Sequence, residues 1–325
     1  MNHWTSRELA TLRRLREGFL NENAGAADYW RSAEEIAIYD ATFAERIGWK
    51  WDAVLRELTA RHWTPRSRRV LDWGCGSGVA GRRVLARWPG FDRLTLHDRS
   101  TLALRFAGER ARELHPQVEC RVGEQVDADT LLVVSHVLNE LASGPRARLL
   151  ESARRAQEIL WVEAGTHANS RRLIEVREEL LNSGEFVAVA PCTHQNRCGM
   201  LTTENAPHWC HHFASPPAEI FQDGRWAEFG RVLGIDLRAL PYSFLVVQRA
   251  PQGATPPGFS RVIGRPRDAK GYSRVLSCQA ENVTDLMVQK RDAPALLKQL
   301  QRGSEAPVYR WTIASGKIVA GEPLK

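Results

Sequence analysis

A short apolar strand that runs into three alternating glycines constrains the fold of this chain more than any other feature. The strand ends in Asp72 and Trp73, and Gly74, Gly76 and Gly78 follow before a helical stretch begins. Glycine lets the backbone turn sharply and approach a ligand closely, while the first turn of the next helix presents free amide groups. The G-x-G-x-G spacing differs from the G-x-G-x-x-G fingerprint of dinucleotide-binding proteins. The pattern therefore predicts a cofactor loop at the end of a buried strand.

Strand-like and helical segments alternate along much of the chain, which predicts a doubly wound α/β fold with a parallel sheet. The strand candidates are 70–73, 94–98, 118–122, 131–136, 159–163, 186–190 and 242–248, with helices at 79–88 and 102–114. Ser32 and Glu35 form a capping-box pattern in a helical amino-terminal region. We expect helices over 1–65, the sheet domain over 66–249 with a cysteine-rich insertion at 191–217, and a Pro/Gly-rich linker at 250–258. A small β-rich module of OB or similar type follows over 259–325, with strands at 259–263, 272–278, 283–289 and 308–313.

The strand, acid and glycine loop resemble motif I of the class I S-adenosylmethionine-dependent methyltransferases. A second acid, Asp98, ends the next strand candidate. The resemblance implies that the loop lies against the methionine part of S-adenosylmethionine and that Asp98 binds the ribose hydroxyls. The predicted cofactor-binding residues are Asp72, Gly74, Gly76, Gly78 and Asp98. The alternative is a loop that keeps the fold but has lost the cofactor.

The segment after the fourth strand candidate carries the predicted catalytic side chains, His136 and Glu140, either of which can act as a general base. It lacks the Asn or Asp followed by Pro-Pro and an aromatic residue that is typical of adenine and cytosine amine methyltransferases. No cysteine nucleophile follows this strand either. The alternative interpretation is structural, with His136 as a hydrogen-bonded residue at the strand end and Glu140 as an acid at a helix start. The pattern supports cofactor binding better than catalysis.

Four of the six cysteines form a pattern that suggests a metal site. Cys192, Cys198 and Cys210 follow one another within 19 residues, and Cys278 lies in the predicted β-rich module. Four thiolates suit a tetrahedral zinc site or an iron–sulfur cluster, but the short spacing that opens most structural zinc sites is missing. Nearby histidines offer ligands for a mixed zinc site: His194, His208, His211 and His212. The alternative to any metal is a set of ordinary loop and core cysteines, as we expect for Cys75 and Cys120.

Taken together, these features resemble the methyltransferase-like proteins of the mitochondrial small ribosomal subunit and their bacterial relatives. The resemblance is carried by Tyr29-Trp30 and by 39–47, 72–78, 135–141, 163–166, 192–211 and Cys278. It implies a [4Fe–4S] cluster that joins the two domains, with zinc as the alternative. The implied ligands are Cys192, Cys198, Cys210 and Cys278. It also implies binding to small-subunit rRNA or its assembly intermediates, and a role in ribosome biogenesis and translation.

The formal net charge of +7 resolves into two arginine clusters. One lies between residues 66 and 87, beside the glycine loop. The other lies in the β-rich module and supplies the predicted RNA-binding residues, namely Arg261, Arg265, Arg267, Lys270 and Arg274. If these residues contact phosphates, the RNA affinity should fall steeply with salt concentration. If they form an ordinary solvated face, no such salt dependence is expected.

Three functions fit the sequence. The first is an rRNA methyltransferase, the second a catalytically silent assembly factor that binds rRNA, and the third, less favoured, a small-molecule methyltransferase. No apolar run approaches the roughly 18 residues of a membrane helix, which excludes a membrane-spanning protein. The first 20 residues contain Glu8 and Glu17 and no apolar signal segment. We therefore expect a bacterial cytoplasmic protein, with the mitochondrial matrix as the alternative.

Overall fold

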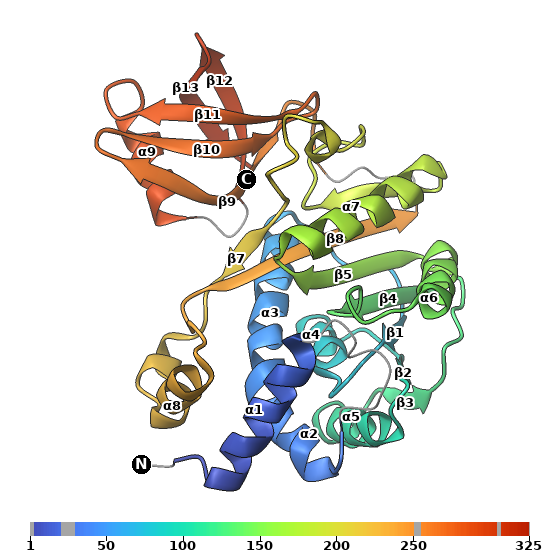
Figure 1. Ribbon diagram of the computed structural model, residues 1–325. Coiled ribbons are helices and arrows are strands. Elements are labelled where there is room, and N and C mark those ends of the chain that lie inside the picture. Colours follow the sequence, from blue (N-terminus) through green and yellow to red (C-terminus); the bar gives the residue numbers. More distant parts are fainter. Residues whose placement is uncertain (1–2, 21–29, 250–254, 304–306, 325) are drawn as a thin grey trace. The chain divides into compact units, whose positions relative to one another are not determined.

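The computed structural model describes residues 3–20, 30–249, 255–303 and 307–324 (Figure 1). The chain divides into two compact units. The first unit contains Met1–Asp52, Pro65–Val162 and Ala214–Leu240, and the second contains Ala53–Thr64, Glu163–Phe213 and Pro241–Lys325. Tyr29 and residues 250–254 of the predicted linker lie outside the described residues. No helix within the described ranges is long and apolar enough to cross a membrane.

The amino-terminal region is helical, as predicted. Its elements are α1 (Ser6–Leu20), α2 (Ala33–Tyr39), the π-helical turn η2 (Asp40–Ala44) and α3 (Glu45–Ala60). Ser32 caps α2, because its side chain accepts a hydrogen bond from the amide of Glu35 at 3.3 Å. The Glu35 carboxylate accepts from the Arg31 amide at 2.9 Å, one residue before the amide that a capping box uses. Ile36 and Phe43 pack in one apolar cluster across the π-helical turn.

Five parallel strands form the sheet of the first unit, in the order β3-β2-β1-β4-β5. They are β1 (Arg69–Trp73), β2 (Arg93–His97), β3 (Glu119–Val122), β4 (Thr130–Ser135) and β5 (Glu158–Ala164). Helices α4 (Val79–Arg87), α5 (Thr101–Leu114) and α6 (Ser143–Arg155) follow β1, β2 and β4. The central strands β1 and β4 are buried along nearly their whole length, as in sheets covered by helices on both faces. The predicted doubly wound α/β fold is confirmed.

The strand order reverses between β1 and β4. Ligands of open α/β sheets bind beyond the carboxyl ends of the strands at such a reversal. The glycine loop after β1 and the segment after β4 therefore flank the expected binding crevice. Helix α8 (Gly224–Leu233) and the short η4 (Ala218–Phe221) complete this unit.

The second unit contains α7 (His167–Asn182), β6 (Phe186–Ala190), η3 (Gly199–Leu201), β7 (His212–Ala214) and β8 (Leu240–Arg249). β6 and β8 pair in antiparallel fashion, and β7 pairs with β8. The strands predicted at 186–190 and 242–248 are therefore correct in position, but they run in opposite directions, so only one of the two can be parallel to the other strands of the sheet. Both are buried along most of their length, so their apolar composition does not distinguish the two directions.

The carboxyl-terminal β module is a closed five-stranded barrel in the order β10-β11-β13-β12-β9. Its elements are β9 (Ser260–Ala269), β10 (Tyr272–Cys278), β11 (Val283–Gln289), α9 (Pro294–Arg302), β12 (Val308–Ala314) and β13 (Lys317–Pro323). β11 and β13 are parallel while the other pairs are antiparallel. This strand order is the Greek-key order of an OB-type barrel, here closed between β9 and β10. The sequence pattern had not predicted α9 or β13; α9 starts at Pro294, and its leucines belong to the barrel core.

Candidate functional site

The glycine loop after β1 has the backbone that its sequence predicts. Gly74, Gly76 and Gly78 have φ angles of 71°, 52° and 80°, in the left-handed region that favours glycine. A Cβ on Gly74 would lie 2.6 Å from Cγ1 of Val137, in the segment after β4. A Cβ on Gly76 would meet nothing within 4 Å. The loop therefore touches the segment after β4 at one glycine and faces open space at the next.

Two carboxylates border this loop. Asp98 follows β2, and its two oxygens accept hydrogen bonds from the Gly76 amide at 2.8 Å and the Ser100 amide at 2.9 Å. Asp72 in β1 accepts from the Gly81 amide at 2.9 Å, and burial raises the pKa of this carboxyl to about 7. Its Oδ1 atom is buried and has no hydrogen-bond partner among the described residues. The structure thus brings the five predicted cofactor-binding residues to one edge of the sheet.

His136 lies beside this edge in a left-handed conformation with φ of 56°. Its Nε2 atom is 3.1 Å from the Nζ atom of Lys50, and its Nδ1 atom is 3.2 Å from the hydroxyl of Ser135, which accepts from the Trp51 indole at 2.9 Å. An ammonium group can only donate, so Nε2 accepts and the neutral ring carries its proton on Nδ1. Burial and the neighbouring Lys50 hold the pKa of His136 well below its usual value. Lys50 was not singled out in the sequence, because nothing local links it to a residue 86 positions away.

The structure shows the surroundings of both predicted catalytic residues. The lone pair of His136 that a general base needs is already occupied by the Lys50 ammonium. Glu140 lies in the turn after β4, where its amide donates to the Val137 carbonyl, and α6 begins three residues later at Ser143. The Lys50 contact therefore leaves His136 without a free Nε2 lone pair.

The four predicted metal-binding cysteines line one cavity in the second unit. The segment 191–210 supplies Cys192, Cys198 and Cys210, and the end of β10 supplies Cys278. All four are free thiols. Residues of α7, β8 and β9 complete the lining. The chain thus gathers cysteines that are up to 86 residues apart in sequence, since 278 − 192 = 86.

Direct protein contacts hold the cysteine segment against the barrel. The Asn205 side chain donates to the carbonyls of Gly199 at 3.0 Å and Val283 at 3.1 Å. A Cβ on Gly199 would lie 2.7 Å from the Val283 amide nitrogen, so only glycine allows this approach of the two backbones. The Asn196 side chain donates to the Ala280 carbonyl at 3.0 Å. Cys198 and Cys278 belong to the apolar cluster at this contact.

Three of the four sulfur atoms have a side-chain nitrogen as neighbour, and the fourth, that of Cys198, has the Met200 backbone amide. Arg177 Nε donates to Cys192 Sγ at 3.2 Å. Cys278 Sγ is 3.6 Å from Nε2 of His194, and Cys210 Sγ is 3.7 Å from Nε2 of His212. Nη2 of Arg177 donates to the carbonyls of His194 and Asn196 in the loop between Cys192 and Cys198, and its Nη1 pairs with Glu178. The sequence analysis noted the histidines as alternative metal ligands but did not single out Arg177.

Burial favours the protonated form of Cys198, Cys210 and Cys278. It raises the pKa of Cys198 to about 11 and raises the pKa values of Cys210 and Cys278 as well. Within the described part of the chain, no three His, Cys, Asp or Glu side chains are gathered closely enough to hold a metal ion. The four thiols are therefore neighbours around one cavity, and the predicted metal site is not preformed.

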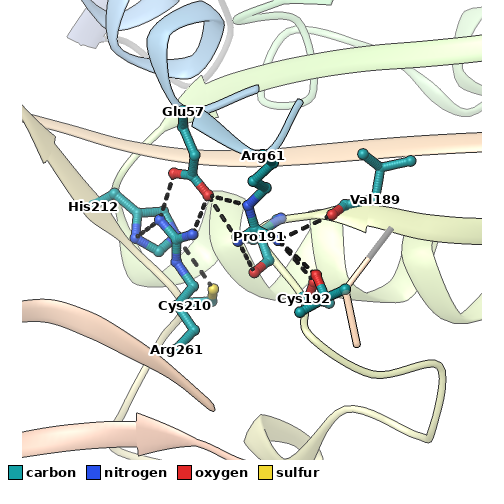
Figure 2. A network of polar contacts seen from close by, with 9 residues as sticks. Glu57, Arg61, Val189, Pro191, Cys192, Cys210, His212 and Arg261 are labelled. Atoms are coloured by element: carbon teal, nitrogen blue, oxygen red, sulfur yellow. Dashed lines mark hydrogen bonds and ion pairs between the residues drawn. The ribbon is translucent and has the colours of Figure 1, made fainter. Parts of the chain in front are cut away.

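A buried ion-pair network lies next to Cys210 and Cys192 (Figure 2). Glu57 pairs with the guanidinium groups of Arg61 and Arg261, and all three side chains are at most 2% exposed. Arg61 also donates to the backbone carbonyls of Val189, Pro191 and Cys192. Arg261 was predicted to bind RNA, and the structure corrects this, because a fully buried and paired guanidinium does not face solvent.

The remaining basic residues of the barrel lie outside its core. Arg267 on β9 and Arg274 on β10 both pair with Asp285 on β11, and β10 lies between the other two strands. The Arg265 guanidinium lies 4.2 Å from the ring centroid of Phe213, and Lys270 is exposed in the turn before β10. In the predicted arginine cluster beside the glycine loop, several arginines are paired with acids: Arg68 with Asp92, Arg69 with Asp127, Arg82 with Asp40, and Arg83 with Glu45. That cluster therefore has less free positive charge than its sequence indicates.

The strand order and the glycine loop define a class I methyltransferase-like fold to which an OB-type barrel is added. The family described as "Mitochondrial small ribosomal subunit Rsm22" matches residues 36–306, and the chain belongs to this family. No curated protein sequence matches the chain.

Several solved structures show a distant likeness. One is a putative RNA methyltransferase from Pyrococcus horikoshii, with 13% identity over 61% of this chain and 84% of that one and a TM-score of 0.38. A second is the plantazolicin methyltransferase BamL in complex with a triazolic desmethylPZN analogue and SAH, with 11% identity, coverage of 74% and 97%, and a TM-score of 0.39. A third is the mitomycin 7-O-methyltransferase MmcR, with 13% identity, coverage of 74% and 67%, and a TM-score of 0.39.

Proposed function

We propose that this protein binds S-adenosylmethionine at the glycine loop and binds small-subunit rRNA or its assembly precursors during ribosome biogenesis. The carrying observation is the loop at the strand-order reversal, with open space at Gly76 and Asp98 beside it. The residues fit the cofactor, because the Asp72 Oδ1 atom and the Ser77 hydroxyl are buried without a partner among the described residues. S-adenosylmethionine would supply an electrophilic methyl group at the carboxyl ends of β1 and β4. Membership of a small-ribosomal-subunit family supports the proposed RNA partner.

We expect Gly76→Ala to raise the dissociation constant of S-adenosylmethionine at least about tenfold, measured by isothermal titration calorimetry. The new methyl group enters the open space of the loop, and its left-handed backbone costs only about 1 kcal/mol of stability. Gly184→Ala is the matched control, because Gly184 also has a positive φ of 75° and no atom within 4 Å of its Cβ position. Unchanged cofactor affinity in Gly76→Ala would contradict the proposed site.

A catalytically silent assembly factor is the second candidate, and the Lys50–His136 contact favours it. The Lys50 ammonium occupies the lone pair that His136 would need as a general base. Immature small-subunit particles and methyl-labelled S-adenosylmethionine separate the two candidates. Label that enters the RNA with the wild-type protein but not with Asp98→Ala identifies a methyltransferase. RNA binding without any transfer of label identifies the silent factor.

We further propose that Cys192, Cys198, Cys210 and Cys278 hold a [4Fe–4S] cluster, with zinc as the alternative. The donor set fits: four thiols line one cavity, and the lining includes Arg177 and Arg261, whose positive charge suits an anionic metal–thiolate group. A bound cluster would supply one-electron redox chemistry and a cross-link between its ligands. Because the thiols are not preformed around a metal, loading would bring their sulfur atoms together and displace their protons.

Anaerobic purification followed by an absorption spectrum and metal analysis tests this site. About four irons per chain in the wild type, lost in Cys278→Ser and kept in Cys120→Ser, supports the cluster. Cys120 is the matched control, because it lies on β3 of the first unit and does not line the cavity. A colourless protein with one zinc per chain would show that the same ligands hold zinc and not a cluster. A metal-free protein would overturn the proposed metal site.

The outer face of the barrel is the proposed RNA surface, because OB folds bind oligonucleotides on the face of their second and third strands. There Arg274 of β10 and Arg267 of β9 share Asp285 of β11 as their partner. We expect Arg267→Gln with Arg274→Gln to weaken single-stranded RNA binding and to reduce the slope of log K against log salt by about 1.4, for two phosphate contacts. Asp285→Asn should tighten binding, because it releases both guanidinium groups.

Fluorescence anisotropy with a labelled RNA between about 50 and 200 mM salt measures these effects. Arg238→Gln is the matched control, because Arg238 is an exposed arginine that also pairs with an acid, Asp236, and lies in the first unit. An unchanged salt slope in the Arg267/Arg274 double variant would contradict the proposal that this face of the barrel binds RNA.

We propose a bacterial cytoplasmic location, with the mitochondrial matrix as the alternative.

A further inference from the structure

His212 lies at the end of a chain of buried polar side chains that leads to the Cys210 sulfur (Figure 2). Glu57 binds two nitrogens of Arg261, one of them at 2.8 Å. The nitrogen at 2.8 Å also lies 3.2 Å from Nδ1 of His212. On the opposite side of the ring, Nε2 of His212 lies 3.7 Å from Cys210 Sγ. All four side chains belong to the second unit.

The chemistry of a guanidinium group determines where the proton of His212 lies. A guanidinium has only donors, so Nδ1 of His212 must accept from Arg261. An imidazole whose Nδ1 accepts is neutral and carries its single proton on Nε2. That proton points at the sulfur of Cys210. The carboxylate of Glu57 prevents Arg261 from turning away, because it engages both terminal nitrogens of the guanidinium.

We propose that Glu57, Arg261 and His212 form a relay that fixes an N–H donor on the Cys210 sulfur and thereby positions this ligand and tunes the metal group that it holds. The inference rests on the proposed cysteine site. Partners behind a ligand orient it, and hydrogen bonds to cluster sulfurs shift the reduction potential. His212 is thus a positioning residue and not a ligand.

The surroundings of Cys210 support this role. The Cys210 carbonyl accepts from the hydroxyls of Ser170 at 2.8 Å and Ser243 at 2.7 Å, so its backbone is also held in place. The other cysteine–histidine pair lacks such a relay. Nδ1 of His194 is buried without a hydrogen-bond partner among the described residues, so no guanidinium holds it as Arg261 holds Nδ1 of His212. The relay therefore distinguishes Cys210 from Cys278.

Nitrogen-15 NMR of histidine-labelled, metal-free full-length protein tests the relay without any metal. We expect the His212 ring to be neutral and protonated on Nε2. A ring protonated on Nδ1, or on both nitrogens, would overturn the proposal. Since this readout needs no cluster, it remains decisive even if metal analysis rejects the proposed iron–sulfur site.

The reduction potential of the loaded protein is the second readout. We expect His212→Phe to make the potential more negative, because the donor to sulfur is lost, and His212→Gln, which restores an amide donor, to recover part of the shift. His211→Phe is the matched control, because His211 contacts the Trp209 carbonyl at 3.0 Å and no cysteine sulfur. Equal potentials in wild type and His212→Phe, at full iron content in both, would contradict the tuning role.

Discussion

We expect Glu57→Gln to lower the free energy of unfolding of the second unit by about 3–5 kcal/mol, the cost of breaking a buried ion pair from one side. Burial alone would raise the pKa of Glu57, but the attraction of Arg261 and Arg61 outweighs it and lowers this pKa. The carboxylate is therefore charged, and its loss leaves two buried guanidinium groups without their counter-ion. A glutamine amide would also place N–H donors against N–H donors.

Urea denaturation of the full chain measures this effect. Asp92→Asn is the matched control: Asp92 pairs with Arg68 in geometry as good, at 2.8 Å, but both side chains are about 60% exposed. Exposed pairs contribute about 0–1 kcal/mol, so the control should scarcely change stability. In a double-mutant cycle, Glu57→Gln combined with Arg261→Gln should cost clearly less than the sum of the single changes. A cost for Glu57→Gln as small as that of Asp92→Asn would mean that the network is solvated.

The sequence was sufficient to predict the features whose cause is local. The glycine loop could be predicted because three glycines at alternate positions follow an apolar strand, and in the structure all three have positive φ angles. Strands β10 and β11 were predicted with their observed ends, because turn-forming residues bound both. The four cysteines were grouped on the chemistry of their side chains, and the structure places them around one cavity.

The errors concern partners that are distant in sequence. Arg261 belongs to a run of basic residues, and nothing near it indicates that its counter-ion is Glu57, 204 residues earlier. His136 looks like a free base until Lys50 is placed on its Nε2 atom. β6 and β8 run in opposite directions, which their apolar composition does not encode. Long-range electrostatic pairing and strand direction are therefore the parts of the site that the structure adds.

The buried carboxyl of Asp72 predicts that stability falls as the pH rises from about 4 to 7. Its ordinary pKa of 3.8 is raised to about 7 by burial, so in this range the folded chain keeps a proton that the unfolded chain loses. Each pKa unit corresponds to about 1.4 kcal/mol, so the loss of stability amounts to at most about 4 kcal/mol and ends near pH 7. Asp72→Asn should remove this dependence, because the amide does not titrate and its oxygen can still accept from the Gly81 amide.

Urea denaturation of wild type and Asp72→Asn at a series of pH values measures this effect. The free energy of unfolding of the wild type should fall relative to that of Asp72→Asn as the pH rises to 7. Asp92→Asn serves again as the exposed control. S-adenosylmethionine adds a second test, because its ammonium and sulfonium groups are cationic and favour the charged carboxylate. If the cofactor binds at this loop, saturating amounts should flatten the pH dependence of the wild type and leave that of Asp72→Asn unchanged. A wild-type pH profile parallel to that of Asp72→Asn would contradict the buried protonated carboxyl, whereas a profile that the cofactor does not alter would place the cofactor's charges away from Asp72.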